Sequence, residues 1–251
     1  MPFAVLVVAA IAQLAGATAA IGLGLVFFLI GTAHGAGDEQ DGEIRPFGLW
    51  QAVAYIFAGL AVSALFFMAP LAGLTLFLAL SLWHFARSLY GEAMRGWAFA
   101  ALVIGGSVAT RFEETAAVFA ALLGAPLPQV WLYNVAIIGW AGIALTVICL
   151  VRNPRDPVLI ATAIAIVALH PVLAVGTAFL IGHALPLQME QARRHGWDAV
   201  LRAQWATSVL AVTGAVAMAV LYLQELVPLT VIAALAFGFT VPHMLAERLE
   251  R

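Results

Sequence analysis

Long apolar runs constrain the fold of this chain more than any other feature of its sequence. Four of them reach or approach the ~20 residues that cross a ~30 Å hydrocarbon layer as a helix: Phe3 to Ile30, Trp50 to Met68, Leu71 to Trp83 and Val130 to Val151. With 64% hydrophobic and 10% charged residues, the 251-residue chain is also far more apolar than one water-soluble core requires. Stretches such as AVLVVAAIA are apolar on every side, which excludes the alternating pattern of a transmembrane barrel. The sequence therefore predicts an all-α, polytopic membrane helix bundle in contact with the lipid bilayer.

Charge and cysteine content exclude several kinds of partner. The net charge is −2 and the 11 basic residues are all arginine, scattered along the chain, so no nucleic-acid patch and no polybasic lipid-binding segment is visible. The single cysteine, Cys149, sits in an apolar run and is expected to be an inert packing residue. Any metal site must therefore use nitrogen or oxygen ligands.

Breaks between the apolar runs predict eight or nine transmembrane segments in a single integral membrane domain, residues 1–251. The stretch 158–188 is either one long helix kinked at Pro171 or two segments that turn near His170-Pro171. With a turn, ten of the eleven arginines share one side of the membrane and Arg111 alone faces the other; with one helix the split is 5 to 6. The positive-inside rule favours the turn. We therefore expect nine segments in the cell inner (plasma) membrane, with an external N-terminus and a cytoplasmic C-terminus.

Four histidines fall in the predicted cytoplasmic half, each on a different segment. Imidazole nitrogen suits iron, zinc or copper, and a neutral imidazole is the ionisable ligand that costs least to hold in a low dielectric. One histidine on a membrane helix is about as often a hydrogen-bonding group between helices as a metal ligand. Four at one depth favour a single metal site, whose expected ligands are His34, His84, His183 and His243.

Weaker candidates lie around these histidines. Asp38 and Glu39 follow His34 across a glycine-containing turn, so either carboxylate could orient an imidazole, although a solvated loop is the alternative. Trp83 and Phe85 flank His84 and are either packing groups or the lining of a substrate tunnel.

Two further histidines are expected to have other roles. His170 precedes a proline on the opposite side, where it either binds a metal or satisfies the backbone of a broken helix. His195, in ARRHGW, is expected to lie at the level of the lipid headgroups.

Short motifs around the histidines are similar to those of a known family. They are Gly31-Thr32-Ala33-His34-Gly35-Ala36-Gly37-Asp38, Ser81-Leu82-Trp83-His84-Phe85, Phe179-Leu180-Ile181-Gly182-His183 after His170-Pro171, and Pro242-His243. Together they resemble the Brp/Blh family of membrane β-carotene 15,15′-dioxygenases. The resemblance implies a multi-helix membrane fold and a histidine-held non-haem iron(II) site. It also implies cleavage of β-carotene, or a related apolar polyene, by dioxygen into two retinals, with His34, His84 and His183 matching iron ligands.

Two positions depart from that family's pattern. Glu39 stands where the first motif usually has a second histidine, and Leu187 stands four residues after His183, where the family often has a further histidine. Leucine cannot bind iron, so either His243 completes the site, or three residues hold the metal, or the site is degenerate.

Two other functions remain open from the sequence. The first is a haem-binding electron-transfer protein that uses pairs of histidines, such as His170 and His183, as axial ligands. The second is a non-catalytic carotenoid or retinal carrier, which the leucine at position 187 would suit. A desaturase-type di-iron enzyme is disfavoured, because no two of the six histidines lie within four residues of each other.

Overall fold

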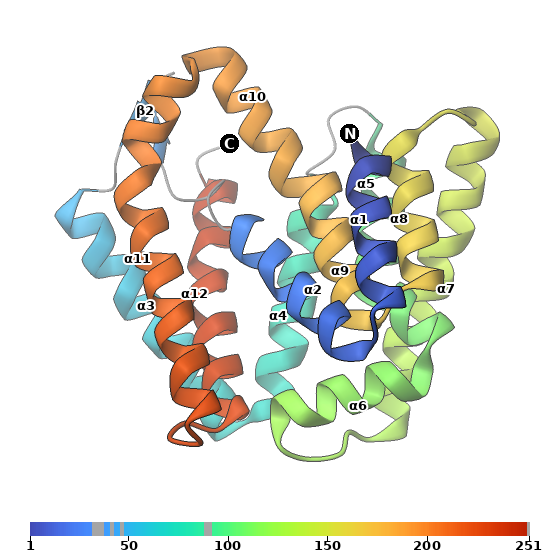
Figure 1. Cartoon of the computed structure of the whole chain (residues 1–251), viewed down its shortest axis with the longest axis horizontal. Coiled ribbons are helices and arrows are strands. Elements are labelled where there is room, and N and C mark those ends of the chain that lie inside the picture. Colours follow the sequence, from blue (N-terminus) through green and yellow to red (C-terminus); the bar gives the residue numbers. More distant parts are fainter. Residues whose placement is uncertain (32–37, 41–42, 46–47, 88–91, 250–251) are drawn as a thin grey trace. The chain divides into compact units, whose positions relative to one another are not determined.

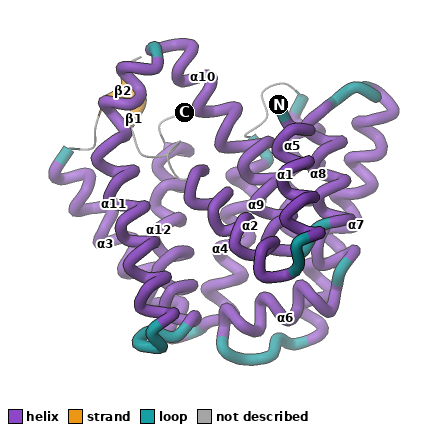
Figure 2. Tube along the Cα trace, viewed as in Figure 1, coloured by secondary structure: helices purple, strands orange, loops and turns teal. Residues whose placement is uncertain are grey.

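The structure is a computed structural model of the chain, and it describes residues 1–31, 38–40, 43–45, 48–87 and 92–249. Nearly all of these residues are helical, as Figure 2 shows, and the two strands among them, β1 (Asp38–Gln40) and β2 (Glu43–Arg45), form a short antiparallel pair. Among the residues that the structure describes, five helices are long and apolar enough to cross a membrane, by length and composition. The predicted class of helical membrane protein is confirmed, while the number of crossings stays a prediction.

The helices follow the apolar runs closely, with most ends within two residues of the runs. In chain order they are α1 (Pro2–Leu14), α2 (Ala17–Gly31), α3 (Leu49–Met68), α4 (Pro70–Phe85), α5 (Ala93–Thr110), α6 (Phe112–Leu123), α7 (Gln129–Arg152), α8 (Pro157–Ala168), α9 (Pro171–Phe179), the π-turn η2 (Leu180–Ala184), α10 (Leu185–His195), α11 (Trp197–Leu223) and α12 (Leu229–Leu249).

The chain folds into two compact units, each assembled from separate stretches. Unit 1 comprises Met1–Gly31, Ser81–Ala120 and Pro126–Pro186, and unit 2 comprises Thr32–Leu80, Ala121–Ala125 and Leu187–Arg251. Two helical stretches, α4 and the continuous helix that begins at Pro171, pass from one unit into the other.

The first predicted segment, Phe3 to Ile30, is not a single helix. It breaks between α1 and α2 at Gly16, whose φ of 110° is a conformation that residues with a Cβ rarely adopt. Figure 1 shows α1 and α2 as the two arms of a V, and the arms pack on each other. The prediction that this run forms a single helix is therefore wrong.

The stretch 158–188 breaks where the sequence predicted a turn. α8 ends at Ala168 and α9 begins at Pro171, which has no N–H to donate and disfavours helical geometry at the residue before it. α8 also packs beside α9 and the turn that follows it, so the chain reverses here. Residues 158–188 are thus two packed helices rather than one kinked helix.

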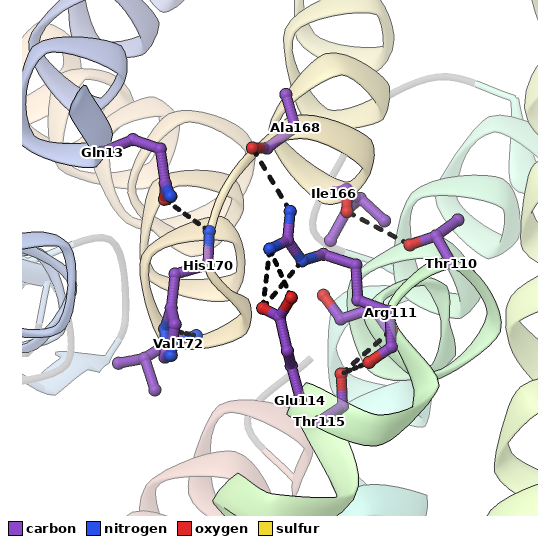
Figure 3. Close-up of polar contacts among 10 residues, drawn as sticks. Gln13, Thr110, Arg111, Glu114, Thr115, Ile166, Ala168, His170 and Val172 are labelled. Carbon is purple, nitrogen blue, oxygen red and sulfur yellow. Dashed lines mark hydrogen bonds and ion pairs between the residues drawn. The ribbon is translucent and has the colours of Figure 1, made fainter. Parts of the chain in front are cut away.

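The backbone groups exposed by this break are satisfied by neighbouring helices (Figure 3). The hydroxyl of Thr110 donates to the carbonyl of Ile166 at 3.2 Å, and the Arg111 guanidinium donates to the carbonyl of Ala168 at 3.4 Å. On the other arm, the peptide N–H of His170 donates to Oε1 of Gln13 at 2.7 Å. Side chains from α1 and from the end of α5 therefore supply partners to the backbone at the break, as a broken helix within a membrane requires.

The opposite end of unit 1 is marked by an ion pair. Nε of Arg95, near the start of α5, donates to Oδ2 of Asp156, the residue before α8, at 2.5 Å. Since Arg111 lies at the α8 C-terminus, α5 and α8 run side by side over most of the length of α5. Arg95 is therefore at one end of α5 and Arg111 at the other.

α7 packs antiparallel to α5 at van der Waals distance. A Cβ on Gly105 would lie 2.3 Å from the backbone nitrogen of Gly139, and a Cβ on Gly142 would lie 2.4 Å from that of Leu102. Small residues of this kind let membrane helices approach closely. Because α5 and α7 are antiparallel, α6 joins them at one end and does not cross between the two ends.

Candidate metal centre

The structure brings together His84 and His183, both of which belong to unit 1. His84 is the penultimate residue of α4, and His183 lies in η2, a single π-helical turn. The turn has a cause in the sequence, because Pro186 cannot donate to the carbonyl of Gly182 four residues earlier and its ring would clash with that carbonyl. The helix therefore widens in the turn that contains His183. Single π-helical turns of this kind are frequent at functional sites.

The two imidazoles meet through their Nε2 atoms, which are 3.0 Å apart. Both side chains are buried, with 4% of His84 and 1% of His183 exposed. The separation suits a hydrogen bond between opposite tautomers. It equally suits two ligands of one metal, because metal–nitrogen bonds of about 2.1 Å place adjacent octahedral positions about 3.0 Å apart. Burial favours the neutral imidazole, which is the form that binds metal.

Phenylalanine rings surround this pair. Phe85 lies edge-on to His183 with ring centroids 5.1 Å apart, and Phe179, one turn before His183, lies 5.5 Å from it. Phe99 packs against Phe85 at 6.2 Å, and a Cβ on Gly182 would lie 2.2 Å from the Phe99 ring. These rings, named here the aromatic wall (Phe85, Phe99 and Phe179), keep the surroundings of the imidazoles apolar.

The C-terminus of α2 ends at the aromatic wall. A Cβ on Gly31 would lie 2.1 Å from Cε1 of Phe179, and Phe28 stacks on the same ring at 5.6 Å. His34 follows three residues later and lies outside the described residues.

The fourth predicted ligand and the position of the missing histidine lie in unit 2. His243 is on α12 directly after Pro242, and its side chain is half-buried. Leu187 is 6% exposed and lies in α10, which continues the helix of His183 without a break.

The weaker candidates divide into those near the pair and those elsewhere. Phe85 contacts it directly, whereas Trp83 has the Arg87 guanidinium 5.9 Å from its ring centroid. Asp38 and Glu39 belong to β1, and their side chains lie outside the described part of the chain.

His170 lies at the other end of α9. It is thirteen residues before His183, or about 20 Å at 1.5 Å per helical residue. Its Nδ1 accepts from the peptide N–H of Val172 at 3.3 Å, so it caps α9 (Figure 3). The structure therefore assigns His170 the backbone role and does not bring it to the pair.

Sequence reasoning missed part of this site. Phe179 was named only as the first residue of a motif, and Phe99 and Pro186 were not singled out. The signals were available in two cases, because Phe179 precedes His183 by four residues and so shares its helical face, and Pro186 follows it closely enough to distort that turn. Nothing in the sequence places Phe99 there, since its contact depends on the packing of α5.

Comparison with protein families decides what kind of chain carries this site. The family model of beta-carotene 15,15'-dioxygenase matches residues 25–249. The chain belongs to the beta-carotene 15,15'-dioxygenase family. This confirms the family resemblance read from the histidine motifs. Comparison with curated proteins and with solved structures gave no match. In this dioxygenase family member, the matched range begins within α2 and ends with α12, so it includes every histidine of the chain.

Proposed function

We propose that the protein cleaves β-carotene, or a closely related apolar polyene, with dioxygen to give retinal. The observation that carries this proposal is the buried contact of His84 with His183, at 3.0 Å between Nε2 atoms, in a helical membrane protein of the dioxygenase family. In this proposal iron(II) is held by these two histidines together with His34 and His243.

The donor set fits such an ion. Neutral imidazoles bind a divalent metal without adding buried negative charge, and fewer than six protein ligands leave positions open. When bound, iron(II) would supply the redox chemistry with dioxygen that side-chain acids and bases cannot provide for an unactivated carbon–carbon double bond.

The chain's own contribution is to orient the polyene and to exclude water. β-Carotene has no polar handle and is already dissolved in the bilayer, so transfer into the protein gains little from the hydrophobic effect. Shape must therefore position the scissile bond. The aromatic wall supplies rigid apolar surface beside the imidazoles, which is what a polyene-binding channel requires.

The geometry argues against the haem alternative. Two axial ligands stand on opposite faces of a haem, so at about 2 Å per iron–nitrogen bond their nitrogens are about 4 Å apart with the ring between them. At 3.0 Å, His84 and His183 leave no room for that ring. His170 lies thirteen residues before His183 along one helical stretch, which is too far for the two to share a haem iron.

We also propose ten crossings, with both termini cytoplasmic in the inner (plasma) membrane. The reversal at Gly16 adds one crossing to the nine predicted from the sequence. It leaves ten of the eleven arginines on the cytoplasmic side and Arg111 alone outside. His84 and His243 then fall in the cytoplasmic halves of α4 and α12.

Expression in β-carotene-producing bacteria tests the proposed reaction. The wild type should bleach the orange colour and yield extractable retinal, with iron near one atom per purified chain. His84→Ala and His183→Ala proteins, inserted to the same level, should leave the colour unchanged. Stoichiometric bound carotenoid without iron or retinal would instead identify a carrier and overturn the proposal.

A further inference from the structure

The helix of His243 is irregular just before that residue. In a regular helix, the carbonyl of Gly238 would accept from residue 242, but Pro242 has no N–H to donate. Two residues earlier, the hydroxyl of Thr240 donates to the carbonyl of Ala236 at 2.7 Å, a contact that often bends helices. The backbone ladder is therefore weakened in the turn from which His243 projects.

A side chain from another helix reaches this weakened turn. The hydroxyl of Tyr55, on α3, donates to the carbonyl of Phe239 at 2.5 Å, and the two rings stack with centroids 6.5 Å apart. Phe239 is four residues before His243, so its carbonyl is the one to which the peptide N–H of His243 points in an α-helix. Tyr55 thus contacts the backbone group that positions His243.

Close packing fixes the distance between these helices, both of which belong to unit 2. A Cβ on Gly238 would lie 2.1 Å from Oγ of Ser63, and a Cβ on Gly59 would lie 2.6 Å from the Phe239 ring. Ser63 itself donates within α3, to the carbonyl of Gly59 at 2.8 Å. α3 therefore presents a rigid surface, and Tyr55 supplies a hydrogen bond from it to the kinked turn.

We propose that Tyr55 is a positioning residue for His243, whose hydroxyl holds the turn before Pro242 and so sets the direction of the His243 imidazole. This inference rests on the proposed function, in which His243 is an iron ligand. A packing role alone would use the ring of Tyr55, and phenylalanine would serve as well. The positioning role requires the hydroxyl, which phenylalanine lacks.

The Tyr55→Phe protein tests this with metal affinity as the readout. Outer groups that orient a metal ligand typically contribute 10–100-fold to affinity. Iron(II) titration of the purified protein should show a loss of about that size, and the visible spectrum of the cobalt(II)-loaded protein should change. Ser63→Ala is the matched control, because it alters the same helix contact without touching α12 hydrogen bonding. Ser63→Ala should lower the melting temperature about as much as Tyr55→Phe does. It should leave the iron(II) affinity and the cobalt(II) spectrum unchanged.

The wild type and His243→Ala, measured alongside, separate failure of this inference from failure of the proposed function. A wild type without metal, or a His243→Ala protein with wild-type affinity, would refute the ligand set itself. If both controls behave as expected, wild-type affinity in Tyr55→Phe overturns the positioning role alone. A Tyr55→Phe protein that fails to insert, when Ser63→Ala inserts, would also overturn it by making the hydroxyl a requirement of the fold.

Discussion

Gly31, the last residue of α2, lies directly against the ring of Phe179, and that ring packs on the imidazole of His183. The contact connects the end of α2 to the histidine pair through one side chain. Any substituent at position 31 must displace the Phe179 ring, on which Phe28 also stacks. A side chain at position 31 would therefore disturb the histidine pair through Phe179, although glycine itself takes no part in the chemistry.

The Gly31→Ala substitution should lower both iron content and product formation several-fold, because the displaced ring pushes on His183. Gly22→Ala, on the same helix, is the matched control. A Cβ there meets no atom within 4 Å, so it should be silent or stabilise the helix by about 0.5–1 kcal/mol. Iron per chain and retinal yield of the two variants decide the point, and equal values would remove the Gly31 contact from the site.

Alanine at His84 or His183 should reduce iron to a small fraction of the wild-type content and abolish product, while the protein still inserts. Each imidazole is buried against the other, and no neighbouring ring of the aromatic wall has a donor atom to replace it. His34→Ala is expected to behave in the same way, and His195→Ala should be nearly silent. Metal analysis of membranes matched for protein level is the measurement. Full iron content in the His84 or His183 variant would exclude that residue as a ligand.

The histidines of the site could be predicted because buried ionisable residues in an apolar chain stand out. His84 and His183 are 99 residues apart, yet their common depth was sufficient to group them. The aromatic wall could not be predicted in full. Fifteen phenylalanines are spread over the chain, and an apolar ring that lines a site has the same composition as one that faces lipid.

The fold was predictable wherever proline breaks a helix and less so where glycine does. Pro171 fixes its own φ and removes a donor, so a break was expected there. Gly16 is one of 22 glycines. Most of the others lie inside helices, where glycine is common because it lets membrane helices pack closely. The sequence around Gly16 therefore does not mark it as a break. The break depends on tertiary packing of α1 and α2 against α8 and α9.

Reporter fusions test the ten-crossing topology. Fusions at the N-terminus, after Arg155 and after Arg194 should all report the cytoplasm, and a fusion after Gly124 should report the outside. The physical reason is that the breaks at Gly16 and Pro171 each return the chain to the arginine-rich side. An external report from the N-terminus would restore a single first crossing, and opposite reports after Arg155 and Arg194 would remove the reversal at Pro171.

Acid should destabilise the protein through Asp156. Burial alone would raise the pKa of this carboxyl, but hydrogen bonds from Arg95 and from the N–H groups of Leu159 and Val158 outweigh it and hold the pKa below its ordinary range. A lowered folded-state pKa contributes stability above the unfolded value of about 3.9, and this is lost as the pH falls through the folded pKa. The melting temperature should therefore fall below about pH 4.

The Asp156→Asn variant removes the ion pair and keeps an oxygen to cap α8. Its free energy of unfolding at neutral pH should be about 2 kcal/mol lower than that of the wild type, between the values typical of exposed and of buried ion pairs. On acidification, this free energy should fall less in the variant than in the wild type. Glu114→Gln, in an exposed pair with Arg111, is the control and should cost well under 1 kcal/mol. Parallel acid profiles for wild type and Asp156→Asn would show that the carboxyl is not responsible.

Leu187 tests how the site is completed. It lies one turn after His183 on a continuous helix, so a histidine there could reach a metal that His183 holds. If His243 has taken over the missing position, His243→Ala should lose iron as completely as His183→Ala, and adding Leu187→His to that variant should restore part of it. If the site is instead a vestige, the wild type should hold little iron and Leu187→His alone should raise the iron content.

We expect takeover by His243, because Pro242 loosens the helix beside it and its predicted depth matches that of the other ligands. Iron per chain in the wild type and in these variants decides between the two, and wild-type iron near one per chain that survives His243→Ala would refute the takeover.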